Sequence, residues 1–373
     1  MIRQATLSPA LAQHAGLRIA LWIALAALLL AAPFLIDAAL GRTWVRIVDV
    51  ALLFMMLALG LNIVVGYAGL LDLGYIAFFA VGAYAYALLA SPQFDIHASF
   101  LLLLPLGALV AAFFGVLLGA PTLRLRGDYL AIVTLGFGEI IRIFLNNLNR
   151  PFNITNGPQG ITLVDPLHLG TVSLAKTHIV AGITIAPVHS YYYVFLACVV
   201  ASIFISARLE DSRIGRAWVA IREDELAAAA MGIHTRNMKL LAFAMGATFG
   251  GVAGGLFASF QGFISPESFT LLDSIMVLCM VVLGGMGNVG GVVLGALLLT
   301  ALPEALRHAG PLQEALFGAV YIDPSDLRML LFGLALVLMM QFRPAGLWPS
   351  KIRRRELAAT REPAGTEGAD VRR

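Results

Sequence analysis

Residues 100–119 read FLLLLPLGALVAAFFGVLLG, a stretch of twenty residues without a charged side chain. A helix of that length rises about 30 Å, which matches the hydrocarbon thickness of a membrane. Backbone polar groups cannot stay unpaired in lipid, and the stretch lacks the alternation of a barrel strand. It therefore predicts a transmembrane helix in an all-α chain.

The rest of the chain repeats this pattern. Of its 373 residues, 60% are hydrophobic and 13% are charged, whereas a soluble domain carries roughly 25% charged residues. We therefore expect an all-α integral membrane protein, a polytopic bundle of about ten transmembrane helices. Eight is the alternative, because the Gly-rich break at 284–288 could be a re-entrant turn. The apolar segments lie near 17–36, 47–65, 70–90, 100–119, 128–147, 190–207, 239–262, 271–286, 288–306 and 327–342.

The basic residues predict the orientation of this bundle. Lys and Arg gather on the cytoplasmic side of membrane proteins. Here they occur at Arg124 and Arg126 between the segments 100–119 and 128–147, in the 208–238 connection and in the C-terminal tail. Together these signals predict cytoplasmic N- and C-termini and an even number of spans. The 149–189 connection, which has few basic residues, is then expected outside.

Two regions follow from this organisation. Residues 1–342 form the expected transmembrane domain, and the run from Ile19 to Ile36 is long for a signal-peptide core, so we interpret it as a retained first helix. Residues 343–373 carry eight basic and four acidic side chains without apolar periodicity. We expect this basic cytoplasmic tail to be disordered.

Motifs of soluble enzymes are missing from the sequence. There is no HExxH, no GxSxG and no Gly-Lys dipeptide, so a Walker A loop is excluded. Two cysteines, Cys198 and Cys279, are too few for a four-ligand zinc site. The basic excess lies in the tail and beside apolar runs. We expect no catalytic residue, no bound cofactor or metal, and no nucleic-acid partner.

The most informative water-facing segment is 213–233, RIGRAWVAIREDELAAAAMGI. Ile214, Trp218 and Ile221 share a face at helical spacing, acidic residues open a second short helix, and Gly232 suits its C-cap. Two short helices that expose an apolar face to the cytoplasm would form a docking surface. An amphipathic loop lying on lipid headgroups is an equally good interpretation of the composition.

This segment resembles the cytoplasmic loop of permeases of ATP-binding-cassette (ABC) importers, in which E-A-A is followed at a distance by Gly. Glu225, Ala227 and Gly232 match that pattern, with Leu226 in place of its first alanine. The chain as a whole is similar to the branched-chain amino acid permeases of the M-subunit type from about residue 45 to 350. The motifs that carry this similarity are GYAGLLDLGY (66–75), LRLRGDYLAIVTLGFGE (123–139), NGPQGI (156–161), FISPESF (263–269) and RPAGL (343–347).

The resemblance implies a function. Such a chain is a permease subunit of the bacterial cytoplasmic membrane that carries leucine, isoleucine and valine. It pairs with a second homologous permease, docks on two cytoplasmic ATPases that use the ATP, and receives cargo from a periplasmic binding protein. We expect the ATPase-coupling residues to be Gly215, Arg216, Trp218, Ile221, Glu225, Ala227 and Gly232.

Five polar side chains within the apolar segments are candidates for the translocation path or its gate: Asn62, Asp72, Thr134, Glu139 and Arg142. Each also has a structural interpretation. Asn62 and Thr134 could bond a neighbouring helix rather than substrate. Asp72 is more readily an N-cap, and Glu139 with Arg142 more readily a pair that fixes helix packing.

An ion-coupled secondary transporter is the main alternative function. In that case Asp72, Glu139 or Asp273 would bind and release the coupling ion within the membrane. Several G-x-x-x-G spacings, such as 246–250–254, could form sliding walls, but close helix packing is their usual meaning.

Overall fold

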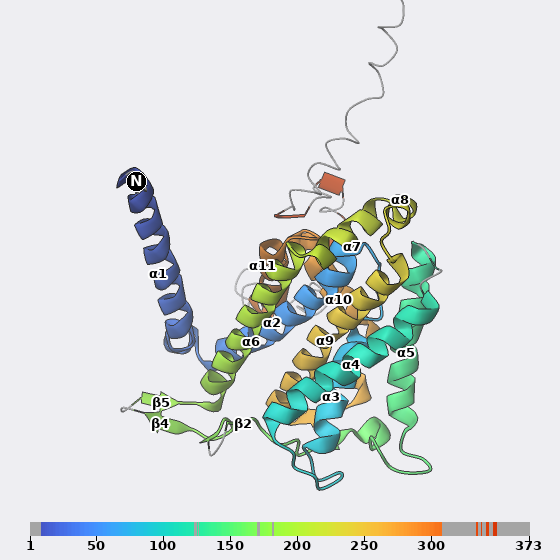
Figure 1. Ribbon diagram of the computed structural model, residues 1–373. Coiled ribbons are helices and arrows are strands. Elements are labelled where there is room, and N and C mark those ends of the chain that lie inside the picture. The colour runs from blue at the N-terminus through green and yellow to red at the C-terminus, as the bar shows by residue number, and fades with distance from the viewer. Residues whose placement is uncertain are drawn as a thin grey trace, which may run out of the picture.

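The computed structural model describes residues 9–122, 125, 127–169, 172–180, 183–307, 333, 334, 337, 341, 342 and 346–348. Within these ranges the chain is a bundle of helices (Figure 1). Most of the apolar segment predicted at 327–342, and nearly all of the predicted tail, lie outside the described residues. The tail prediction is therefore untested.

The helices coincide with the predicted apolar segments to within a few residues at most ends. Their bounds are α1 Pro9–Leu40, α2 Arg42–Leu61, α3 Ile76–Leu89, α4 Phe100–Thr122, α5 Asp128–Asn147, α6 Pro187–Glu210, α7 Arg213–Glu223, α8 Glu225–Ala230, α9 Thr235–Gln261, α10 Leu271–Gly284 and α11 Val289–Arg307. A π-helix, Asn62–Tyr67, prolongs α2, and short 3-10 turns cover Gly157–Gln159 and Pro266–Ser268.

Six of the described helical segments are long and apolar enough to cross a membrane, and α3 and α11 are apolar but shorter. The prediction of an all-helical, polytopic membrane protein is confirmed at that level. The number of about ten spans and the orientation of the termini stay predictions. One reason is visible in α3, whose 14 residues rise only about 21 Å, less than the roughly 30 Å of hydrocarbon.

Three small antiparallel sheets accompany the helices. β1 Ile161–Thr162 pairs with β6 Phe263–Ile264, β2 His168–Leu169 with β3 Val172–Ser173, and β4 His178–Val180 with β5 Ile183–Ile185. Figure 1 shows β2, β4 and β5 at one end of the bundle and α7 and α8 at the other. The 149–189 and 208–238 connections thus lie at opposite ends of the bundle, and which of them faces the cytoplasm stays a prediction.

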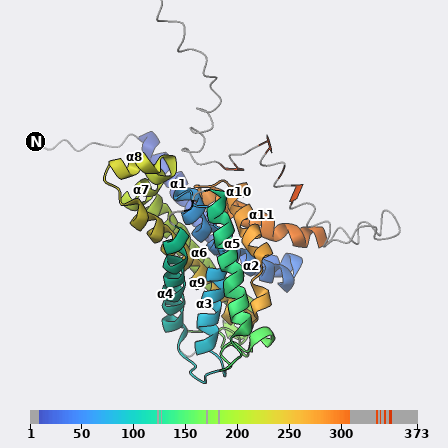
Figure 2. The same ribbon diagram turned by 90° about the vertical axis from the view of Figure 1, so that its right-hand side faces the viewer.

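Glycines on α9 bring the central helices together. A Cβ added at Gly82 of α3 would overlap the backbone of Gly251, and one at Gly246 would contact the carbonyl of Gly60 on α2. Such close backbone approach requires small residues. The packing interpretation of the G-x-x-x-G spacings is therefore confirmed for α9. Figure 2 shows α3, α4 and α5 along the bundle and α11 running across it.

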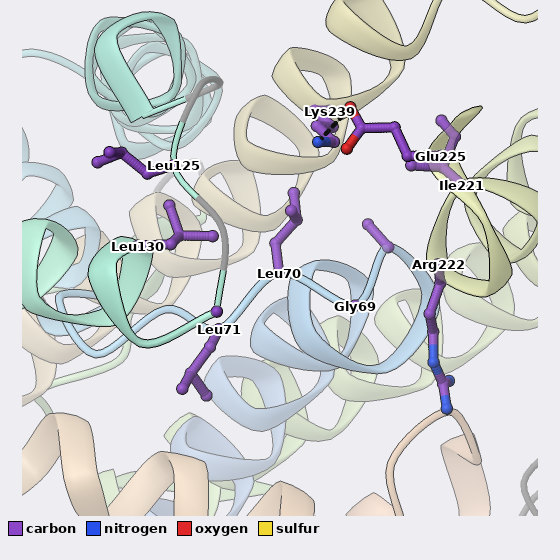
Figure 3. Close-up of a pocket in the computed structure, with 11 residues that line it drawn as sticks. Gly69, Leu70, Leu71, Leu125, Leu130, Ile221, Arg222, Glu225 and Lys239 are labelled. Atoms are coloured by element: carbon purple, nitrogen blue, oxygen red, sulfur yellow. Dashed lines mark hydrogen bonds and ion pairs between the residues drawn. The ribbon is translucent and has the colours of Figure 1, made fainter. Parts of the chain in front are cut away.

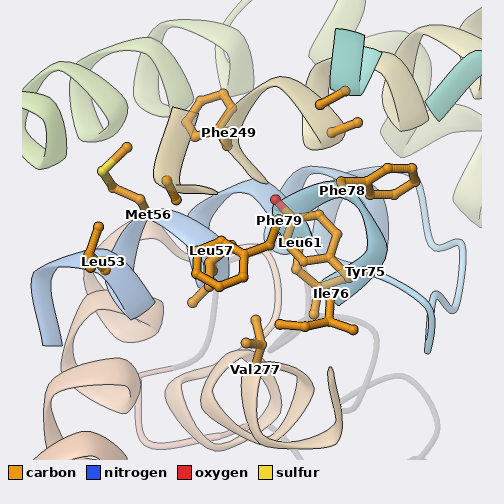
Figure 4. Close-up of a cluster of buried hydrophobic side chains, with 14 of the residues drawn as sticks. Leu53, Met56, Leu57, Leu61, Tyr75, Ile76, Phe78, Phe79, Phe249 and Val277 are labelled. Atoms are coloured by element: carbon orange, nitrogen blue, oxygen red, sulfur yellow. The ribbon is translucent and has the colours of Figure 1, made fainter. Parts of the chain in front are cut away.

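The end of α2 and the start of α3 form the centre of the apolar core. Figure 4 shows Leu57, Phe79 and Val277 converging there from three helices. The buried hydroxyl of Tyr75 donates to the carbonyl of Gly246 at 2.8 Å, which satisfies a polar group that would be costly to bury alone. The break between α2 and α3 is thereby held rigidly against α9.

Candidate functional site

The segment between α6 and α9 folds as two capped helices. The Ser212 hydroxyl accepts from the amide of Gly215 at 3.1 Å to begin α7. The Asp224 carboxylate accepts from the amides of Leu226 and Ala227 at 2.8 and 3.0 Å to begin α8. Gly232 follows α8 with φ of 85°, a left-handed conformation that favours glycine. The predicted helix pair and its C-cap are confirmed.

The apolar face of α7 is buried, contrary to the predicted exposure. Trp218 is 0% exposed and Ile221 is buried, and the Trp218 indole donates to the Met238 carbonyl of α9 at 2.7 Å. Because α7 lies against α9, the amphipathic face gains more from burial within the chain than it would in water. The exposed large apolar side chains are instead Leu226 (72%) and Met231 (84%), on and just after α8.

The other expected coupling residues are likewise partly buried in the bundle and partly exposed. Gly215 is buried, where a side chain would overlap the carbonyl of Leu209. Arg216, Ala227 and Gly232 are exposed, and Arg216 donates to the carbonyl of Asp211 at 2.6 Å. The α8 end of the segment therefore faces water, whereas α7 anchors it to the bundle.

Glu225 is half-buried and paired rather than free. Its carboxylate accepts from the ammonium of Lys239 at 2.6 Å, and the Lys239 side chain is only 7% exposed. The pair joins α8 to the first turns of α9. Sequence reasoning missed Lys239, although a lysine at the start of an apolar helix, fourteen residues after an acid, is the available signal.

Arg222 connects the same segment to the break after α2. Its guanidinium donates to the carbonyl of Gly66 at 2.7 Å, within the π-helix that ends α2. π-Helical segments commonly mark functional sites. Figure 3 shows Arg222 extending away from α7, while Glu225 and Lys239 meet on the other side of a pocket lined also by Gly69, Leu70 and Leu130.

Asn62 links this π-helix to the turn between α10 and α11. Its side-chain oxygen accepts from the amide of Gly287 at 2.8 Å. Beyond that turn, the amides of Leu347 and Trp348 donate to the carbonyls of Leu283 and Gly284 at 2.8 and 3.0 Å. The RPAGL motif thus contacts the end of α10, next to the turn that Asn62 holds. Asn62 therefore bonds a neighbouring turn through its oxygen, and its role in the translocation path stays a prediction.

Asp72 has a different role from the predicted N-cap. Its Oδ1 accepts from the amide of Gly74 at 2.9 Å, an Asx turn inside the break. The first turn of α3 is served instead by Ser274, whose hydroxyl accepts from the amide of Ile76 at 3.0 Å. Thr134 of α5 accepts from the amide of Leu73 at 3.0 Å, so it bonds a neighbouring segment of the chain.

Glu139 and Arg142 lie toward the opposite end of α5 and form part of a three-residue cluster. Arg142 donates to Glu139 at 3.0 Å and to both oxygens of Glu267 at 3.2 Å. The structural pair is therefore confirmed, and it also joins α5 to the turn before α10. Glu267 was missed because it lies 125 residues away. Asp273, the third acid of the ion-coupled alternative, forms a capping box with Thr270 at the start of α10.

The family model described as "Branched-chain amino acid transport system / permease component" matches residues 43–340. The chain belongs to this permease family. Its members are transport permeases and not enzymes, which agrees with the multi-pass helical fold.

Several permeases of the family are similar to this chain over most of its length. The high-affinity branched-chain amino acid transport system permease protein LivM of Escherichia coli (strain K12) is 43% identical over 339 residues, covering 88% of this chain and 74% of that protein. The probable LivM of Methanocaldococcus jannaschii is 30% identical over 67% of this chain and 69% of its own. LivH of Salmonella typhimurium is 27% identical over 69% and 82%. No solved structure matches the chain significantly.

Proposed function

We propose that the chain is the permease subunit of an ABC importer that carries leucine, isoleucine and valine across the bacterial cytoplasmic membrane. Membership of the permease family and the names of its LivM and LivH relatives support this cargo. The chain has no Walker A loop, so separate ATPases supply the energy. The ATPases dock on the 208–238 connection.

One contact carries the mechanism: the 2.7 Å hydrogen bond from Arg222 of α7 to the Gly66 carbonyl. Through this hydrogen bond, a movement of α7 shifts the π-helix that ends α2. Asn62 of the same π-helix then passes the movement to the turn between α10 and α11. ATP binding draws the ATPases together and shifts the bundle between outward-open and inward-open states. Nucleotide biases this equilibrium by as much as it favours one state over the other.

The docking surface on this chain is α8 and the turn after it. Leu226, Ala227 and Met231 are exposed there, and apolar side chains that protrude from a short helix suit a cleft on a partner protein. Trp218 and Ile221 contribute indirectly, because their burial fixes α7 on α9. When an ATPase moves α8, the Glu225–Lys239 pair transmits that movement to α9, as α7 also does.

The two ends of the bundle also indicate where the binding protein and the second permease would bind. With α7 and α8 in the cytoplasm, the 149–189 connection lies outside and receives the binding protein. A second, homologous permease completes the membrane part, which the similarity of this one chain to both LivM and LivH supports. Both termini are cytoplasmic in this arrangement.

Reconstitution tests the function directly. The chain, its partner permease, the two ATPases and the binding protein are placed in vesicles, and uptake of labelled leucine is measured with and without ATP. The importer requires ATP and tolerates ionophores that collapse ion gradients. Uptake by this chain alone, driven by an ion gradient, would instead support the secondary transporter. The engagement of Glu139 and Asp273 in structural contacts favours the importer.

A further inference from the structure

A groove of about 180 Å³ lies on the side of the bundle where α6 and α9 both pack against α2. Figure 1 shows these three helices side by side. All three helices contribute to its lining, which consists of Met56, Cys198, Ala201, Ser202, Ile205, Thr248, Phe249 and Val252. The five candidates for the translocation path and the α7–α8 segment lie outside this lining. The proposed transport cycle therefore gives the groove no role.

The groove is hollow because short side chains face it from α6 and α9. Ala201, Ser202 and Thr248 form its walls, and Met56 and Phe249, which are buried, form its floor. Figure 4 shows Met56 and Phe249 close together at one edge of the apolar core. An empty hollow loses van der Waals contacts. Because α6 and α9 are both long and apolar enough to cross a membrane, a hydrocarbon chain from the lipid is the group available to fill it.

An exposed stripe on α6 connects the groove to the end of that helix. Ala201, Ile205 and Arg208 are spaced i, i+4 and i+7, so they share one helix face, and all three are exposed. Arg208 lies in the last turn of the 24-residue helix, at the level of the lipid headgroups in a spanning segment. Its guanidinium lies 5.3 Å from the centre of the Phe204 ring. It forms no ion pair with another residue that the structure describes.

A second cation reaches the same end of α6. Arg216 of α7 is exposed and donates to the carbonyl of Asp211, the C-cap of α6, at 2.6 Å. A guanidinium has five N–H donors, so this bond leaves others for a further acceptor. The acid next to this end, Glu210, lies about 160° around the helix from Arg208, where it accepts from the Tyr67 hydroxyl at 3.5 Å. Two arginines at the end of a membrane helix suit an anionic headgroup.

We propose that the groove binds one anionic phospholipid, with an acyl chain between α6 and α9 and its phosphate on Arg208 and Arg216. Ala201 and Arg208 are seven residues apart, a rise of about 10 Å, and one leaflet of hydrocarbon is about 15 Å thick. One lipid molecule therefore spans both parts of the site. The bound lipid holds α6 and α9 against α2, next to the start of α7. The inference goes beyond the proposed function and does not depend on the cargo.

Native mass spectrometry of the intact transporter in mild detergent tests the headgroup contact. Phosphatidylglycerol or phosphatidylcholine with the same acyl chains is added, and the retained lipids are counted. The wild type should prefer phosphatidylglycerol, and Arg208→Gln should lower that preference about tenfold, the effect of losing a charged hydrogen bond. Arg236→Gln is the control, because Arg236 is exposed and lies about 120° around α9 from Thr248. Equal retention of the two lipids by the wild type, or an unchanged preference in Arg208→Gln, would overturn the proposal.

Ala201→Phe tests the groove itself by filling it. This variant should retain one phospholipid fewer than the wild type, and added phosphatidylglycerol, which raises the melting temperature of the wild type by binding the folded state, should raise that of the variant less. Val200→Phe is the matched control, because Val200 is exposed on the same helix but does not line the groove. An unchanged lipid count in Ala201→Phe would overturn the proposal; it is also the result expected if a second permease covers the groove.

Discussion

Arg222 of α7 and Gly66 of the π-helix lie 156 residues apart and are joined by a 2.7 Å hydrogen bond. The acceptor is a carbonyl at the end of a central helix, and the donor lies on the segment proposed to contact the ATPases. Hydrogen bonds that involve a charged group contribute about 1.5–3 kcal/mol. This contact is therefore strong enough to couple the two elements.

Trp218 is predicted to be a structural anchor. Trp218→Ala would empty a fully buried site and cost about 3–5 kcal/mol, whereas Trp218→Phe would lose mainly the bond to Met238, about 1 kcal/mol. Thermal unfolding of the purified protein in detergent measures both. Leu226→Ala is the control, since it should leave the melting temperature unchanged and weaken ATPase binding. Wild-type stability of Trp218→Ala would contradict the buried position of the indole.

Close approach of α3 and α9 predicts a contrast between two glycine substitutions. In Gly82→Ala the new methyl group would overlap the backbone of Gly251, and such overpacking costs about 1–3 kcal/mol. In Gly136→Ala the methyl group would meet nothing within 4 Å, so the better helix propensity of alanine should leave stability equal or slightly higher. The two melting temperatures decide the matter; equal values would disprove the contact.

Glu139, Arg142 and Glu267 are predicted to act as a packing cluster. Arg142→Gln leaves two carboxylates without their cation and should lower stability, while Glu267→Gln in the same chain should recover part of the loss. Because Glu267 is exposed, the coupling should be modest, about 0.2–1 kcal/mol. A double-mutant cycle measures it. Additive effects of the two changes would mean that the pair does not interact.

His97 and Asp165 predict a pH-sensitive connection outside the membrane helices. The hydrogen bond and the charge of Asp165 raise the pKa of His97 above its ordinary value of 6.5. The stabilising contact is therefore fully present below pH 6.5 and is lost as the pH rises through the raised pKa. The protection factors of amides in residues 90–99, which correct for the intrinsic rise of exchange with pH, should fall over that rise. Asp165→Asn should remove the pH dependence; if the dependence persists in this variant, another group causes it.

The positions of the long helices, the end of α8 and the closely packed face of α9 could be predicted from the sequence. Apolar runs gave the positions of α2, α4 and α9 because lipid leaves few alternatives to a helix. Gly232 predicted the end of α8, because the left-handed backbone after a helix favours glycine. The G-x-x-x-G spacing of α9 predicted that another helix packs closely on that face, because only small residues allow such an approach.

Contacts between distant segments could not be predicted. The hydrophobic periodicity of α7 showed that Trp218 and Ile221 share a face, but not whether that face meets water, a partner or α9. The same limit hid the pairing of Glu225 with Lys239 and the contact of Arg142 with Glu267. Asp72 was assigned the wrong hydrogen-bond partner because Ser274, the residue that serves the first turn of α3, lies 198 residues from Ile76.

The ratio of leucine imported to ATP hydrolysed, measured in vesicles that contain the complete transporter, tests the coupling through Arg222 most directly. In Arg222→Ala the ATPases should still bind, while the ratio falls at least about tenfold, as the loss of more than 1.4 kcal/mol of coupling would produce. Arg213→Ala, on the exposed side of the same helix, should keep the wild-type ratio. A wild-type ratio in Arg222→Ala would contradict the account.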